Sequence, residues 1–225
     1  MASVNGTSDA TSVPGGPPTR DATYFLEPLF FLVEDGIFQV PKHHFQLNDV
    51  FSTTFMLPPP LGETAEGSSE KKPFELRGIL KKDFQAFLRV LYPLGVPNNY
   101  EDLTSEEWQS VLRLSSMWEF QSLRDLAVQW LGKPGMLDSV SKIQLGESYD
   151  LHDWFVAGCG EIVVRKKGPR GEEMVRLGHD MTERLYDLRE AHLRAQGGFH
   201  NVRYDVGTAV KNEFVDVLGE VEYTW

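Results

Sequence analysis

The chain has 225 residues, with 33 acidic and 22 basic side chains and a formal net charge of −11 at pH 7. A surface of that sign repels a phosphate backbone, so we expect no nucleic-acid partner. The single cysteine excludes an intramolecular disulfide. Together with the lack of a signal-peptide pattern, it predicts an intracellular protein of the cytoplasm, the nucleus or both. No apolar run reaches the roughly 18–20 residues that span a bilayer, so we expect no membrane association.

The first part of the chain predicts a tail and then a β-hairpin. Residues 1–22 are rich in Ser, Thr, Gly and Pro and have no periodicity, which is typical of a disordered tail. Leu29–Val33 and Ile37–Val40 are short apolar runs on either side of Asp35-Gly36, a strong hairpin signal. We expect Gly36 to adopt the positive φ that a two-residue turn requires.

Between residues 41 and 91 the pattern predicts a helix, a polar loop, a short strand and a second helix. Pro41 stands where the first helix would start, because its fixed φ and missing N–H cost nothing in a first turn. Apolar side chains recur at helical spacing over Leu47–Phe55, and three prolines then end that helix. A Gly/Ser-rich loop follows, and Phe74–Arg77 alternates between apolar and charged residues, as a half-buried strand does. Asp83 lies at the predicted start of the second helix, where a carboxylate is favourable.

Residues 103–131 are the stretch around which the rest is organised, and they predict two helices joined by a tight turn. Thr104 and Glu107 have the spacing of a capping box, in which each side chain accepts from the other residue's backbone N–H. The helical phase breaks in the middle, where Ser122 and Asp125 repeat the capping pattern. The predicted core side chains of this pair are Trp108, Leu112, Trp118, Leu126 and Trp130.

After residue 135 the pattern stays helical. Asp138 can cap one helix, and Cys159 lies on the apolar face of the next. Residues 172–188 predict one long amphipathic helix, with Glu172 and Arg176 paired one turn apart.

Several of these elements together resemble a BTB (POZ) domain. The hairpin, Phe38-Gln-Val-Pro-Lys42 and Phe74-Glu-Leu76 follow one another in the order of that family. The segments Leu103-Thr-Ser-Glu-Glu-Trp108 and Trp118–Ala127 are similar to the version abundant in mushroom-forming fungi. The resemblance covers roughly residues 24–165.

This resemblance implies an α+β fold, in which a small sheet with a cluster of helices precedes a mostly helical extension. We accordingly divide the chain into a tail (1–22), a BTB domain (23–133), a helical extension (134–196) and a C-terminal tail with a short helix (197–225). The implied function is a non-enzymatic protein–protein interaction module, and members of this family often self-associate as homodimers through the BTB domain. The alternative is a substrate adaptor that docks a cullin in a ubiquitin ligase, and co-purification of a cullin would distinguish the two.

The resemblance also indicates where subunits would meet. The amphipathic helix that precedes the first strand in strongly dimeric relatives is absent, and only Tyr24 and Phe25 stand there. Other aromatic residues lie in the first strand and the first helix. The candidate interface residues are Tyr24, Phe25, Phe30, Phe31, Phe45 and Phe51.

The sequence offers few groups for catalysis. Gly146-Glu-Ser-Tyr-Asp150 lacks the final glycine and the preceding strand of a nucleophile elbow, and Cys159 sits among apolar residues. His43 and His44 project in different directions without a third ligand nearby. The basic turn Arg165–Arg170 indicates either a solvated loop or a nuclear-import or docking patch. We expect no catalytic residue, no metal, no cofactor and no small-molecule substrate.

Overall fold

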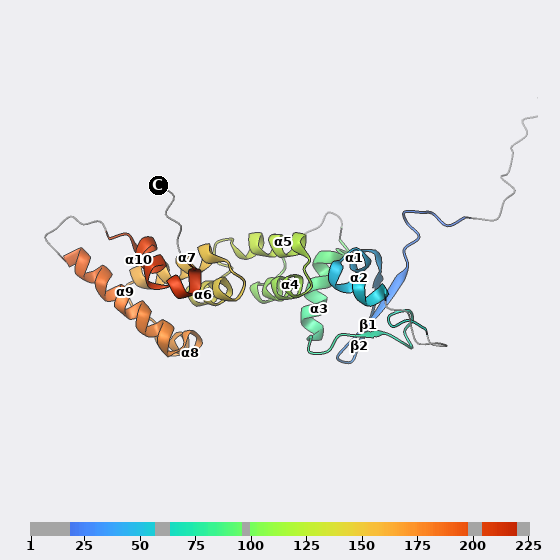
Figure 1. The fold of residues 1–225 in the computed structure, drawn as a ribbon, viewed down its shortest axis with the longest axis horizontal. Coiled ribbons are helices and arrows are strands. Elements are labelled where there is room, and N and C mark those ends of the chain that lie inside the picture. Colours follow the sequence, from blue (N-terminus) through green and yellow to red (C-terminus); the bar gives the residue numbers. More distant parts are fainter. Residues whose placement is uncertain (1–18, 57–63, 96–99, 198–203, 220–225) are drawn as a thin grey trace, which may run out of the picture. The chain divides into compact units, whose positions relative to one another are not determined.

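The computed structural model describes residues 19–56, 64–95, 100–197 and 204–219, with the backbone alone described at 54–56 (Figure 1). The chain divides into two compact units, Met1–Leu76 and Arg77–Trp225. The first unit contains a small sheet, and most of the described chain is helical. The predicted α+β fold class is therefore confirmed. Residues 1–18 of the predicted tail lie outside the described part of the chain.

The described residues of the N-terminal unit form a three-stranded sheet and two short helices. In chain order they are β1 (Pro28–Val33), β2 (Gly36–Pro41), α1 (His43–Gln46), α2 (Asp49–Met56) and β3 (Phe74–Glu75). β1 is the central strand, antiparallel to β2 and parallel to β3. Alternate residues of β1 are buried, namely Leu29, Phe31 and Val33, so one face of the sheet carries the core of this unit.

The hairpin forms as predicted, but its turn lies one residue earlier than expected. Gly36 pairs with Val33 and opens β2, so the two loop residues are Glu34 and Asp35. Glu34, and not Gly36, has the positive φ, at 53°. The position of the turn follows from the register, because a shift by one residue would move Phe31 and the other core residues of β1 to the opposite face.

The single helix predicted from Pro41 through Phe55 is two helices in the structure, α1 and α2. α1 ends at Gln46, and the buried side chain of Asn48 accepts a hydrogen bond from the backbone N–H of Phe51 at 3.2 Å. A side-chain oxygen in that position acts as an N-cap, so Asn48 starts α2 as a separate helix. Leu47, between the two helices, is consequently 81% exposed.

The C-terminal unit is built from helices throughout its described residues. They are α3 (Lys81–Leu91), α4 (Ser105–Met117), α5 (Gln121–Leu131), α6 (Ser139–Ser148), α7 (His152–Val164), α8 (Glu172–Leu177), α9 (His179–Gly197), α10 (Val206–Glu213) and α11 (Val215–Leu218). One hydrophobic cluster joins α3, α4 and α5, and a second joins α6, α7, α9 and α10. Val210 and Phe214, in the stretch predicted as a C-terminal tail with a short helix, are fully buried in the second cluster.

The capping box at the start of α4 is confirmed. The Glu107 N–H donates to Thr104 Oγ1 at 3.2 Å, and the Thr104 N–H donates to Glu107 Oε2 at 2.8 Å. Both backbone donors would otherwise lack a partner at the helix start. The two side chains thus fix the first turn of α4.

The predicted cap of α5 is wrong. The N-cap residue is Phe120, which makes no side-chain cap, while Asp125 accepts a hydrogen bond from Gln121 Nε2 at 2.7 Å. Glu119 adopts a positive φ of 58° directly after α4. This left-handed residue reverses the chain so sharply that α5 begins at Gln121, one residue before the predicted cap Ser122.

Helices α6 and α7 are packed closely, and two glycines permit it. A Cβ added to Gly146 would lie 2.6 Å from the backbone nitrogen of Phe155. A Cβ added to Gly158 would lie 2.6 Å from the carbonyl oxygen of Ser139. Both distances are too short for a side chain. The glycines lower the intrinsic stability of the two helices, but they allow the helix backbones to come into contact.

The long helix predicted over residues 172–188 is two helices. Gly178 has a φ of 78° and separates α8 from α9. The predicted pair of Glu172 with Arg176 is replaced by a longer-range contact, because Arg176 Nη1 donates to Asp138 Oδ2 at 2.8 Å. Since Asp138 is the N-cap residue of α6, as predicted, Arg176 joins α8 to the start of α6.

A single arginine holds the C-terminal helices against α9. Arg184 Nη1 lies 2.9 Å from Asp216 Oδ2, and its Nε lies 3.1 Å from Glu213 Oε1. The guanidinium carbon is 4.0 Å from the centroid of the Phe214 ring. The side chain therefore contributes ion pairs and a cation–π contact at one place.

Candidate protein-interaction surface

An exposed turn before β1 presents consecutive apolar side chains. Asp21 Oδ1 accepts hydrogen bonds from the backbone N–H groups of Thr23 at 2.8 Å and Tyr24 at 2.7 Å. Such a carboxylate-anchored turn constrains the backbone. Three consecutive apolar side chains are exposed at the end of this turn. Tyr24 is 84% exposed, Phe25 is 53% exposed and Leu26 is 46% exposed. Two of the six predicted interface residues, Tyr24 and Phe25, are thus exposed.

Charge contacts position the same turn. The backbone N–H of Tyr24, and secondarily that of Thr23, lowers the pKa of the Asp21 carboxyl, so the anchor stays ionised near neutral pH. The Arg20 guanidinium carbon lies 4.4 Å from the ring centroid of Phe25. A side chain that is ordered before binding loses less conformational entropy when a partner arrives.

Three other predicted interface residues form the interior of the N-terminal unit. Phe31 and Phe45 are fully buried, and Phe51 is nearly so. Their ring centroids are 4.8 Å apart for Phe31 and Phe45, and 5.0 Å apart for Phe45 and Phe51. Phe30 lies on the other face of β1 and is half-buried. The structure therefore brings Phe31, Phe45 and Phe51 together as a core and leaves Tyr24 and Phe25 exposed.

Sequence reasoning missed other exposed apolar residues of this unit. Leu47 is 81% exposed, and Ile37 in β2 is 48% exposed. Leu47 stands four residues before the buried Phe51, which predicted that both would share one buried helix face. The break at Asn48 removes that relation. The asparagine itself was the signal, because this residue favours helix starts.

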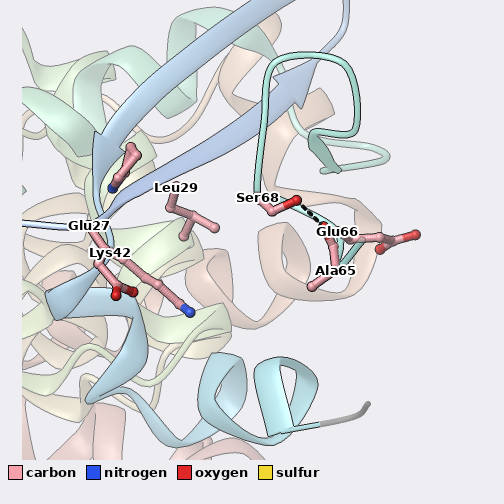
Figure 2. A pocket seen from close by; sticks show the side chains of 8 residues that line it. Glu27, Leu29, Lys42, Ala65, Glu66 and Ser68 are labelled. Atoms are coloured by element: carbon pink, nitrogen blue, oxygen red, sulfur yellow. Dashed lines mark hydrogen bonds between the residues drawn. The ribbon is translucent and has the colours of Figure 1, made fainter. Parts of the chain in front are cut away.

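Figure 2 shows a pocket of about 250 Å³ at the start of β1. The Leu29 side chain lies between Lys42 on one side and Ser68 on the other, while the Glu66 carboxylate points away. Gly67 is required there, because its φ is 74° and an added Cβ would lie 2.5 Å from Leu29 Cδ1. The Ser68 hydroxyl in this pocket donates to the carbonyl oxygen of Ala65 at 2.6 Å, so the hydroxyl proton is directed to the backbone and not to a base. Its lining residues are Glu27, Pro28, Leu29, Lys42, Ala65, Glu66, Gly67 and Ser68.

The predicted core residues of the helix pair lie in or against one cluster, with the exception of Trp118. Trp108 and Leu112 are fully buried, and Leu126 and Trp130 are half-buried against the same cluster. The Trp108 and Trp130 rings are stacked, with centroids 5.4 Å apart. Trp118 is also buried, but it packs edge-on against rings of α3.

Asp83 does more than stabilise the start of α3. Its side chain is buried and accepts a hydrogen bond from Ser110 Oγ at 2.7 Å. It also pairs with the guanidinium of Arg113. The carboxylate thus joins α3 to α4, a role that no local pattern in the sequence could indicate because the partners are 27 and 30 residues away.

The residues with chemically reactive side chains lie in surroundings that do not favour catalysis. Burial raises the pKa of the Cys159 thiol to about 12, so the thiolate needed for nucleophilic attack is not formed near neutral pH. Burial, and then the neighbouring His43, lowers the pKa of His44. Ser148 is the last residue of α6 and does not follow a strand. Within the described residues no cluster of His, Cys, Asp and Glu could hold a metal ion.

Side-chain hydrogen bonds hold both ends of the basic turn after α7. Arg165 donates two hydrogen bonds to the Glu173 carboxylate, at 2.8 and 2.7 Å. Tyr186 Oη donates to the carbonyl of Pro169 at 2.8 Å. Lys166, Lys167 and Arg170 are exposed on this turn. The geometry suits a solvated loop and a docking patch equally, so both interpretations stand.

No family model matches the chain, and no curated protein matches it. Among the helices of the described residues, none has both the length and the apolar character needed to cross a bilayer. The function therefore has to be argued from the chain's own residues. The positioned turn at Tyr24–Leu26 is the feature that most resembles a binding surface.

Proposed function

We propose that this chain is a non-enzymatic protein–protein interaction module of the BTB (POZ) type, which self-associates through the turn at Tyr24–Leu26. The observation that carries the proposal is the turn itself, where two aromatic residues and a leucine are exposed in sequence on a backbone anchored by Asp21. Aromatic side chains are enriched in the centres of protein interfaces, where they bury large areas.

The order of the elements supports the BTB assignment. A hairpin, two short helices, a third strand parallel to the first, and then α3 with the α4–α5 pair occur in succession (Figure 1). The motifs on which the resemblance rests fall on those elements, with Phe74-Glu75 forming β3 and Thr104-Glu107 capping α4. The proposal thus rests on sequence motifs and topology together.

The polar side chains support the non-enzymatic part. Asp83, Asp138 and Arg184 each join helices through ion pairs. Cys159 is a buried thiol with a raised pKa. Groups committed to packing in this way are poor candidates for proton transfer or nucleophilic attack, because both require access to a substrate.

The test is the self-association of the full chain, measured by sedimentation velocity and light scattering at micromolar concentrations. The double variant Tyr24→Ser with Phe25→Ser should weaken association at least about tenfold, as expected for the loss of interface anchors. The matched control is Val175→Ser in α8, an 82% exposed apolar residue that should leave association unchanged.

A chain that stays monomeric at all concentrations would contradict self-association. An assembly that the double variant leaves intact would contradict the turn as its interface. Both side chains project into solvent, so we expect neither substitution to disturb the fold, and far-UV circular dichroism checks this.

A further inference from the structure

The outer side of β2 carries backbone groups that the sheet does not use. The register places Ile37 opposite Leu32 and Gln39 opposite Phe30. In an antiparallel pair with a two-residue turn, hydrogen-bonded pairs alternate from the pair beside the turn. The pairs of Ile37 and Gln39 are then the non-hydrogen-bonded ones. Their N–H and C=O groups therefore point away from β1.

The contacts of β1 establish the same alternation independently. The Phe30 N–H donates to the Gly67 carbonyl at 2.9 Å, and the Leu32 carbonyl accepts from the Leu76 N–H at 2.9 Å. Both bonds are directed away from β2. In the sheet order β2-β1-β3, no described strand lies on the outer side of β2.

Within the described residues this edge carries one feature that commonly limits strand pairing, Pro41 at its end, and it has no lysine, no bulge and no covering strand. β2 pairs regularly over its six residues, without a bulge, and Gly36–Pro41 contains no charged side chain. Ile37 is 48% exposed, and Gln39 is exposed as well. Natural edge strands are commonly protected by lysine, by bulges or by a covering segment, and an unprotected one is a template for another strand.

We propose that β2 pairs antiparallel with β2 of a second copy of this chain, about a two-fold axis at Phe38. In that register Ile37 of each copy lies opposite Gln39 of the other. All the outward N–H and C=O groups of these two residues then find partners across the axis. A self-complementary contact of this kind closes as a dimer.

Charge complementarity fixes the register and favours a second copy as the occupant. Glu34 and Lys42 flank Phe38 symmetrically in the sequence, so the two-fold at Phe38 brings the acidic turn of each copy beside Lys42 of the other. A two-fold at Gln39 would instead set Ile37 opposite Pro41, which has no N–H to donate. Opposite charges at both ends of the new ladder therefore select the Phe38 register.

This pairing goes beyond the proposed function, because it uses main-chain groups of β2 and not the side chains of the turn before β1. The experiment is accordingly done in the full chain carrying Tyr24→Ser and Phe25→Ser, which removes the other surface. Sedimentation velocity and light scattering over a concentration series should show a remaining monomer–dimer equilibrium.

Two substitutions at the edge should weaken that dimer. Ile37→Lys places two like charges near the axis and should raise the dimer dissociation constant at least about tenfold. Gln39→Pro removes an outward N–H and should act in the same direction. The matched control Gln39→Thr keeps the N–H and should leave the constant within about twofold. If Gln39→Pro does not fold, the pairing is tested by Ile37→Lys and by the charge reversals Glu34→Lys and Lys42→Glu.

Reversal of the end charges tests the register. Glu34→Lys and Lys42→Glu should each weaken the dimer, and the two together should restore it to within about twofold of the parent. Lack of this rescue overturns the register and with it the proposal. A background chain that is strictly monomeric, or a dimer indifferent to Ile37→Lys, also overturns it. A chain that stays monomeric but binds an extended peptide along β2 identifies a different occupant and overturns self-pairing.

Discussion

Both units of this chain have apolar cores, and the contacts described within them differ. The core of the N-terminal unit includes phenylalanine rings from β1, α1 and α2, with the centroids of Phe31 and Phe45 4.8 Å apart. In the C-terminal unit, ion pairs join helices that are distant in the sequence, as Arg176 joins α8 to α6 and Arg184 joins α9 to α10 and α11. Apolar burial has no direction, whereas an ion pair fixes the position of two particular atoms.

The difference indicates where binding is to be sought. The helical unit uses its arginines and aspartates to connect its own elements, and its last helices are fastened to α9. The N-terminal unit exposes Tyr24 and Phe25, and among the described strands none lies beside the outer backbone groups of β2. Both association proposals therefore concern the N-terminal unit. The following predictions test the packing of the C-terminal unit through its stability.

The largest effect is expected for Trp118→Ala. The side chain is buried, with its ring 5.1 Å from Phe87 and 6.0 Å from Phe84. Removal of a buried indole from such packing should cost about 3–5 kcal/mol of unfolding free energy. Denaturant unfolding measures it, with the neighbouring, 53% exposed Met117→Ala as control. A midpoint equal to that of the control would mean that the packing of α3 against α4 is wrongly described.

Gly146→Ala should destabilise the second helical cluster. The new methyl group would meet the backbone of Phe155 at 2.6 Å, so α6 and α7 must separate, at a cost of about 1–3 kcal/mol. Gly160→Ala is the matched control in α7, because its nearest neighbour would be Val206 Cγ1 at an ordinary 3.7 Å. That control should gain helix propensity and stability. Equal melting temperatures for the two variants would exclude close helix contact at Gly146.

Arg184→Ala should loosen α10 and α11 before the rest of the unit. The side chain is 18% exposed and joins Glu213 and Asp216, so we expect a loss of about 1–2 kcal/mol that diminishes in high salt. Amide hydrogen exchange over Val206–Leu218 is the readout. Arg194→Ala removes an exposed pair with Glu190 within α9 and should leave exchange in that segment unchanged. Equally faster amide exchange across the whole unit would contradict a local role of Arg184 in holding α10 and α11.

The smallest effect is a pH dependence from Asp138. Burial disfavours its charge, but hydrogen bonds from Arg176 and Ser141 outweigh burial and lower its pKa from 3.8 to about 2. A depressed pKa in the folded state stabilises above the unfolded value, and the contribution disappears as the pH falls from about 4 to 2. Asp138→Asn keeps the cap without the charge. Urea midpoints of this variant should fall less steeply than those of the parent over that range, and parallel curves would contradict the pair with Arg176.

Local chemistry in the sequence accounts for much of the fold. The hairpin, the capping box of Thr104 with Glu107, the Asp138 cap and the buried face of Cys159 all follow from neighbouring residues, and all occur in the structure. Of the candidate interface, exposure of Tyr24 and Phe25 matches what the sequence suggested. Whether they form a subunit contact stays a prediction.

Other features depend on residues far apart in the chain, and local patterns could not reveal them. Arg176 was assigned to Glu172 because a one-turn spacing is visible in the sequence, but Asp138 offers a carboxylate already oriented by its role as a cap. Asp83 was taken for a dipole partner, although Arg113 and Ser110 hold it. Phe31, Phe45 and Phe51 were candidates for a surface and form a core instead within the unit.

By itself the sequence determined the β-hairpin, the caps that start α4 and α6 and the absence of charge from β2, since these depend on residue type and spacing. The tertiary structure alone decided which aromatic residues are buried, which carboxylate each arginine meets and which edge of the sheet is open. The physical reason is that caps and turns are satisfied within a few residues, whereas burial and ion pairing depend on the neighbours that the complete fold supplies.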